Sequence, residues 1–144
     1  MKKYIDLSIF YFVLAMISGV FYREFYKFMD FRGDSTLGTL HVHLMVLGVL
    51  VFLLVIILAK LFPIEQNKNM KRFMIVYNVG LLMLTATLTT RGIVQVNGIA
   101  LSAAANGALS GIAGLSHILL AIGWLFLLLI LRKTITNDID DKKD

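Results

Sequence analysis

The chain contains three histidines, and each stands within an apolar stretch of the sequence. His41 and His43 are separated only by Val42, and His117 lies far downstream, after a run of small residues. An imidazole inside a membrane helix is costly unless it faces a partner. Neutral imidazole is also the commonest metal-ligating side chain. We therefore take His41, His43 and His117 as candidate ligands of a metal ion or of a metal-containing cofactor.

The spacing of the histidine pair restricts what it can bind. Two residues that are two positions apart on an α-helix point about 200° apart, so His41 and His43 cannot easily hold one ion together. A six-coordinate haem iron instead takes two imidazoles on opposite sides of the macrocycle, from two helices or two subunits. The residue types therefore favour haem b, with His41, His43 and His117 as the candidate axial ligands.

Haem also carries two carboxylates, which need cationic partners near the edge of the membrane. Arg91 is the main candidate for bidentate pairing with these propionates, and Arg23 is a second one. Gln95 lies four residues after Arg91 and therefore on the same helix face. We include these three residues in the predicted cofactor site. The alternative is that both arginines extend to lipid phosphates and that the histidines only bridge helices.

The composition defines the elements that must position these residues. Of 144 residues, 58% are hydrophobic and only 16% are charged; the mean hydropathy is +0.82. These values exclude an ordinary soluble domain. Four apolar stretches of about 20 residues predict an all-α integral membrane bundle of four helices, forming one domain over 1–136. The predicted spans are about 5–26, 37–62, 72–95 and 109–132. Residues 137–144 are expected to form a charged, solvated and disordered tail.

Basic residues predict the orientation of these spans. Ten lysines and arginines fall on the side of the two termini and four on the other side. The positive-inside rule then places both termini in the cytoplasm of a multi-pass bacterial plasma-membrane protein. His43 and His117 would lie roughly 9 Å and 12 Å from the outer ends of their helices, at a shared level. The net charge of +5 is assigned to topology and to contact with membrane lipid, and no nucleic-acid partner is expected.

Other features narrow the function classes. Without cysteine the chain has no thiolate metal site and no covalent haem attachment, and it shows no nucleotide-binding or serine-hydrolase motif. No catalytic residue is assigned, and the chain is not expected to be an enzyme by itself. Tyrosines and Trp124 are expected to be packing or membrane-belt aromatics. Gly107 and Gly111 have the GxxxG spacing that permits close helix approach, either within one subunit or between subunits.

The sequence resembles a family of small four-span bacterial membrane proteins of unknown function, found mostly in Firmicutes. The resemblance covers the whole chain, and its most specific segments are 22–25, 41–44, 90–92 and 110–114. The resemblance implies the four-span architecture and leaves the function open.

A second, more distant resemblance concerns His41-Val42-His43 and the five residues that follow. This segment is similar to a helix of haem-copper oxidase subunit I in which two histidines point toward two haems. The resemblance implies haem ligation by this pair, propionate binding at Arg91, and a homotrimer of four-helix subunits that imitates the twelve helices of the oxidase. The copper-site histidines of the oxidase are lacking, so electron transfer with a redox partner, or redox or gas sensing, is expected in place of oxygen reduction.

Two alternatives to haem remain open on the sequence. His41 and Met45 lie four residues apart on one helix face, as a copper site would need, and His117 could be a third ligand of copper or zinc. Alternatively, the protein is a non-catalytic membrane scaffold or a small transporter, in which the histidines only join helices.

Overall fold

The structure is a computed structural model that describes residues 1–140 and the side chains of residues 1–136. The first helix is α1 (Lys2–Phe28). The second is continuous but has three parts, α2 (Leu37–His43), η1 (Leu44–Leu50) and α3 (Val51–Leu61). A short 3-10 turn, η2 (Ile64–Gln66), leads to α4 (Asn69–Val96), and α5 (Ala103–Asp140) follows. All regular elements of the described part are helical, which confirms the predicted all-α four-helix bundle.

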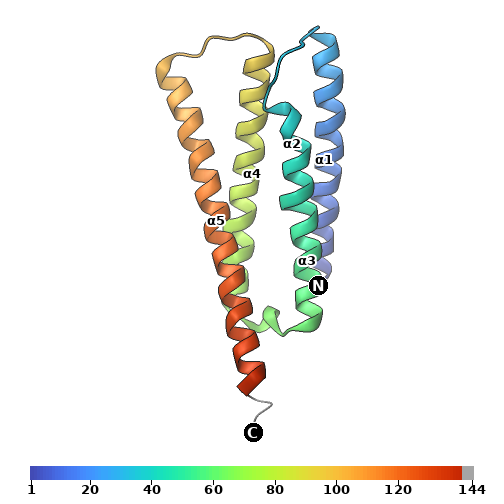
Figure 1. Cartoon of the computed structure of the whole chain (residues 1–144), viewed down its shortest axis with the longest axis vertical. Coiled ribbons are helices and arrows are strands. Elements are labelled where there is room, and N and C mark those ends of the chain that lie inside the picture. Colours follow the sequence, from blue (N-terminus) through green and yellow to red (C-terminus); the bar gives the residue numbers. More distant parts are fainter. Residues whose placement is uncertain (141–144) are drawn as a thin grey trace.

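The four long helices run antiparallel, with the N-terminus and the end of α5 at the same end of the bundle (Figure 1). All four are long and apolar enough to cross a membrane. Their outward faces are strongly apolar; the side chains of Ile17 and Val20, for example, are 60% and 65% exposed. A surface of this kind is stable against lipid and unfavourable in water. The fold is therefore that of a multi-pass membrane protein.

The fourth helix departs most from the prediction, because it is longer at both ends. Its N-terminus lies at Ala103, where the Ser102 hydroxyl accepts a hydrogen bond from the Ala105 amide at 3.2 Å and so caps the helix. At the other end α5 continues through Asp140. The expectation of a disordered tail is therefore wrong for 137–140, where the sequence has no proline or glycine to stop the helix. The rest of the predicted tail, 141–144, lies outside the described residues.

The other helix ends follow from local sequence. Phe62 is extended, as the residue before Pro63 must usually be, and α3 ends there. Gly98 adopts a φ of +63° after α4, and the Ile99 amide then bonds to the Val94 carbonyl at 3.1 Å. This is the glycine-dependent closure of a helix C-terminus.

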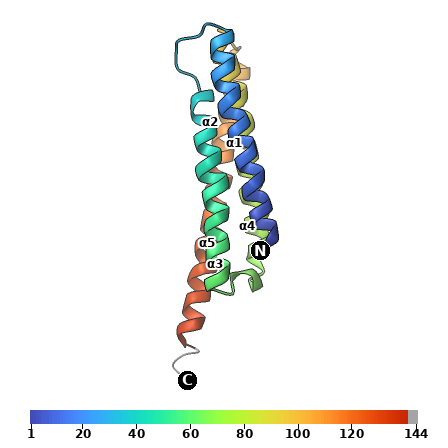
Figure 2. The same cartoon turned by 90° about the vertical axis from the view of Figure 1, so that its right-hand side faces the viewer.

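The helices are packed unevenly. α1 contacts α2, η1 and α3, while α5 packs mainly against α4. Figure 1 shows α5 beside α4, and Figure 2 shows α1 beside α2 and α3. The buried positions of α5 recur every three or four residues, a narrow stripe typical of a two-helix seam: Ser116, Leu120, Gly123, Leu127, Ile130 and Thr134. Toward the loop that joins them, α4 and α5 separate (Figure 1). Most of the surface of α5 is therefore free of contacts within the subunit.

An aromatic cluster joins all four long helices. The ring of Tyr11 on α1 stacks on that of Phe52 on α3, with centroids 5.7 Å apart. Tyr77 on α4 packs edge-on against Phe52 and against Trp124 of α5. Tyr11 and Tyr77 are almost completely buried. Tyr11 and Tyr77 are therefore packing aromatics, which is one of the two roles expected for the tyrosines.

The second helix contains a feature that the sequence analysis did not predict. Directly after His43, residues 44–50 form a π-helix, a wider turn that is uncommon and often lies at functional sites. Side chains from two neighbouring helices donate to carbonyls of this segment: the Tyr77 hydroxyl to Leu47 at 2.8 Å and the Ser8 hydroxyl to Val49 at 3.3 Å. Such bonds satisfy backbone oxygens that the wider turn leaves less well paired.

Gly48 lets α1 approach the π-helix, and its substitution gives a first prediction. A Cβ at position 48 would lie 2.5 Å from the Tyr11 Cβ. We expect Gly48→Ala to destabilise the protein by about 1–3 kcal/mol through overpacking, measured as unfolding in detergent by circular dichroism. Gly107→Ala is the matched control, because nothing lies within 4 Å of the added methyl group. Equal stability of Gly48→Ala and Gly107→Ala would contradict the close contact.

Candidate histidine and arginine site

His43 and His117 have the same local geometry on two different helices. The Nδ1 atom of His43 lies 2.8 Å from the Thr39 carbonyl oxygen, and the Nδ1 atom of His117 lies 2.8 Å from that of Ala113. The His117 side chain is exposed, and the His43 side chain is half-buried. Each imidazole is therefore held by the carbonyl four residues earlier in its own helix.

This geometry determines the tautomer of both rings. A carbonyl oxygen can only accept a hydrogen bond, so the neutral imidazole carries its proton on Nδ1. The lone pair is then on Nε2, and within residues 1–136 no partner bonds to this atom in either ring. A metal-ligating histidine is typically oriented in this way, with one ring nitrogen donating to a backbone carbonyl and the other free for the metal.

His41 differs from the other two histidines. It is half-buried like His43, but its Cβ lies 3.7 Å from the position that a Cβ of Gly19 on α1 would occupy. Its Nδ1 atom is buried without a hydrogen-bond partner within the described part of the chain. His41 thus lies against α1, whereas the His43 ring bonds to the Thr39 carbonyl of its own helix, so the two imidazoles do not converge.

Arg91 lies near the end of α4 and joins it to α5. Its guanidinium donates to the Asn106 amide oxygen at 3.2 Å and to the Ser110 hydroxyl at 2.8 Å. Both partners are neutral, and none of the acidic side chains of residues 1–136 forms an ion pair with Arg91. Ser110 and His117 are seven residues apart, so they share one face of α5 at a separation of about 10 Å along the helix.

The other two residues of the predicted site have different surroundings. The Gln95 side-chain oxygen accepts a hydrogen bond from the Thr36 amide at 2.9 Å and so ties α4 to the beginning of α2. Arg23 is 83% exposed, and its nearest acidic atom is the Glu24 carboxylate at 3.9 Å. Gln95 therefore has a structural contact, and Arg23 lies on the surface at the end of α1.

The depths of His43 and His117 differ, contrary to the expected shared level. A Cβ at Gly92 would contact Leu37 on α2, and one at Gly80 would contact Leu119 on α5. Gly92 and Gly80 are about 18 Å apart along α4, which puts Leu119 about 18 Å deeper in the bundle than Leu37. His43 lies only about 9 Å deeper than Leu37. Since His117 precedes Leu119 by about 3 Å along α5, it is roughly 6 Å deeper than His43. The reason is that α5 begins earlier and is shifted along α4 relative to the prediction.

Within the described residues, no group of three histidine, cysteine, aspartate or glutamate side chains is arranged to hold a metal ion. The three histidines therefore do not form a common metal site in one subunit. Met45, the copper ligand considered beside His41, is half-buried and packs against the hydrophobic core. The geometry instead offers two separate imidazoles, those of His43 and His117, each oriented by a backbone carbonyl. It also offers the Arg91 guanidinium, which has no ion-pair partner among residues 1–136.

Sequence reasoning missed several residues of this site. Asn106 and Ser110, which accept hydrogen bonds from Arg91, lie in a segment that was predicted in part as a loop. Their spacing of four residues, which places them on one helix face, was the only signal in the sequence. The expectation that Gly107 and Gly111 could serve contacts within one subunit is wrong, since no atom lies within 4 Å of either position. The close helix contacts of the subunit lie at Gly48, Gly80, Gly92 and Gly123.

Comparison with known proteins gives a family and no function. Residues 1–134 match the family model described as "Protein of unknown function (DUF2871)". No curated protein and no solved structure matches the chain, so none of these comparisons links it to haem-copper oxidases. Because the match covers nearly the whole sequence, the chain belongs to this family of proteins of unknown function.

Proposed function

We propose that the protein is a membrane-embedded b-type haem-binding protein, in which His43 and His117 supply axial imidazoles and Arg91 binds a propionate. The haem would serve electron transfer or redox or gas sensing. Bound haem would supply one-electron chemistry. The protein would bind it, orient it and limit the access of water.

The observation that carries this proposal is the matching geometry of His43 and His117. Each Nδ1–H is bonded to a backbone carbonyl at 2.8 Å, which fixes the ring and raises the basicity of Nε2. A histidine that merely joins helices would be expected to direct its free nitrogen at a neighbouring helix. Here His117 is exposed and His43 is half-buried, and neither Nε2 atom has a partner within residues 1–136, which leaves both atoms for a cofactor.

The polar group around Arg91 supports the same function. Its guanidinium has two neutral partners, Asn106 and Ser110, so its charge is left for an anion. A carboxylate is the natural bidentate partner of a guanidinium. Because His117 follows Ser110 on the same face of α5, one macrocycle could extend from His117 toward Arg91.

The location and assembly belong to the same proposal. The distribution of basic residues favours a bacterial plasma membrane with both termini in the cytoplasm, which puts Arg91 near the outer surface. The exposed His117 and the free surface of α5 favour a homo-oligomer, for which we propose a trimer. The redox partner would then dock at the membrane surface.

A spectrum of the purified protein tests the proposal. We expect protein expressed with a haem supply to be red in detergent, with a Soret band, a sharp α-band on reduction and up to one haem per chain. A colourless protein that contains stoichiometric copper or zinc would overturn the proposal in favour of the metal-site alternative. A colourless protein without metal would favour a scaffold or transporter.

A further inference from the structure

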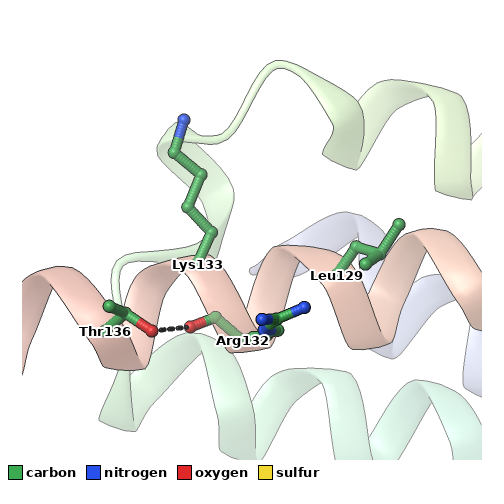
Figure 3. A pocket seen from close by; sticks show the side chains of 4 residues that line it. All are labelled: Leu129, Arg132, Lys133 and Thr136. Atoms are coloured by element: carbon green, nitrogen blue, oxygen red, sulfur yellow. Dashed lines mark hydrogen bonds between the residues drawn. The ribbon is translucent and has the colours of Figure 1, made fainter.

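A second candidate site lies at the opposite end of the bundle from Arg91. Four side chains of α5 line an open pocket of about 310 Å³, namely those of Leu129, Arg132, Lys133 and Thr136. Figure 3 shows these side chains, with Lys133 extending away from the axis of α5 and Arg132 directed toward Leu129. The Thr136 hydroxyl donates to the Arg132 carbonyl at 3.0 Å. None of these residues takes part in the proposed haem site.

The pocket is strongly cationic. Arg132 and Lys133 are both exposed, and neither forms an ion pair with any acidic side chain of residues 1–136. Arginine offers a planar fork that matches phosphate oxygens, and lysine adds a second point charge. Two such groups beside each other on one shallow, open surface favour an anionic ligand over a cationic one.

The pocket also lies at the boundary between apolar and polar surface. The outward side chains of α5 just before this point are apolar, with Leu125, Leu128 and Leu129 each about half exposed. The next exposed residues are Arg132 and Lys133. A change from exposed leucine to exposed cations within one turn marks the membrane interface, where a lipid headgroup meets its acyl chains.

We propose that this pocket binds the headgroup of an anionic phospholipid, with Arg132 and Lys133 contacting the phosphate and Leu129 contacting the apolar part. Basic pockets beside membrane helices on the cytoplasmic side typically bind anionic headgroups. Inorganic phosphate could meet the same two cations, but it would make no use of Leu129. The amphipathic lining therefore favours the lipid over the free ion.

Lipid titration of the purified full-length protein, followed by native mass spectrometry, tests this site. We expect phosphatidylglycerol to bind at least about tenfold more tightly than phosphatidylcholine, and Arg132→Gln/Lys133→Gln to remove most of this preference. Leu129→Gln should weaken phosphatidylglycerol binding as well. The control is Lys27→Gln/Arg32→Gln, which removes the same charge from exposed residues at the other end of the bundle.

Three results would overturn the proposal. One is that Arg132→Gln/Lys133→Gln, with unchanged helix content, binds phosphatidylglycerol as the unmodified protein does. Another is an equal loss in the Lys27→Gln/Arg32→Gln control, since this would show a general effect of net charge. The third is displacement of the lipid by inorganic phosphate at an equal concentration, which would identify a site for a free anion. Haem content is measured separately, so failure of the haem proposal does not affect this test.

Discussion

His43→Ala and His117→Ala are each expected to abolish the spectrum of a haem iron with two histidine ligands. Removal of an axial imidazole deletes a direct bond to iron. The loss of haem affinity should therefore exceed the roughly 10- to 100-fold that loss of an outer partner of a metal ligand typically costs. The measurement is the Soret and α-band spectrum, together with the haem-to-protein ratio after purification in detergent. Helix content should be unchanged, because His117 is exposed and His43 is only half-buried, so neither substitution removes a core side chain.

His41→Ala distinguishes this ligand pair from the other pairs that the sequence allows. Its imidazole lies against Gly19 on α1 and its Nδ1 atom is buried, so we expect the variant to keep its haem. Loss of colour in His41→Ala and retention in His43→Ala would show that the pair was assigned wrongly. Retention of the full spectrum in all three alanine variants would exclude axial ligation by histidine.

The same variants show whether a haem lies within one subunit or between two. α2 and α5 have no extensive contact with each other, so both arrangements are compatible with the fold. If His43 of one copy and His117 of the next bind one iron, co-expression of His43→Ala with His117→Ala restores part of the haem signal in mixed oligomers. If both ligands come from one copy, each variant chain lacks a ligand and the mixture stays colourless.

The fold was largely predictable because membrane insertion imposes strong constraints on sequence. Runs of about 20 apolar residues define spans, and Pro63 and Gly98 end two of them by backbone geometry. The extent of α5 was not predictable in this way. Helical structure there extends past the apolar run in both directions, through Ser102 capping and a continuation without helix breakers.

The site was predictable only in the identity of its residues. The histidines and Arg91 stand out because such side chains are costly in apolar segments. Their depths could not be derived, because they depend on how far α5 is shifted along α4, and that shift is set by close contacts at Gly80 and Gly123. The π-helix after His43 has no sequence signature of its own, since it depends on Tyr11, Tyr77 and Ser8 of other helices.

Tyr77→Ala is expected to produce the largest loss of stability among substitutions in the bundle. The Tyr77 ring is fully buried and contacts aromatic side chains from α3, α4 and α5. Deletion of a buried aromatic ring typically costs about 3–5 kcal/mol, because the cavity closes only in part. The measurement is reversible unfolding in mixed micelles. Phe28→Ala is the control, since Phe28 is 85% exposed and its loss should cost no more than about 0.5 kcal/mol.

Tyr77→Phe separates the ring from the hydroxyl, and it links the aromatic cluster to the candidate haem site. The variant keeps the ring and loses only the hydrogen bond to the Leu47 carbonyl at 2.8 Å, so it should cost about 0.6–1.7 kcal/mol. That carbonyl belongs to the π-helix that follows His43. We therefore expect faster amide hydrogen exchange in residues 44–50 of Tyr77→Phe, with the rest of the bundle unchanged. If exchange in this segment stays the same, Tyr77 does not hold the π-helix, and the backbone next to His43 is stabilised by the contacts of Tyr11 and Ser8 alone.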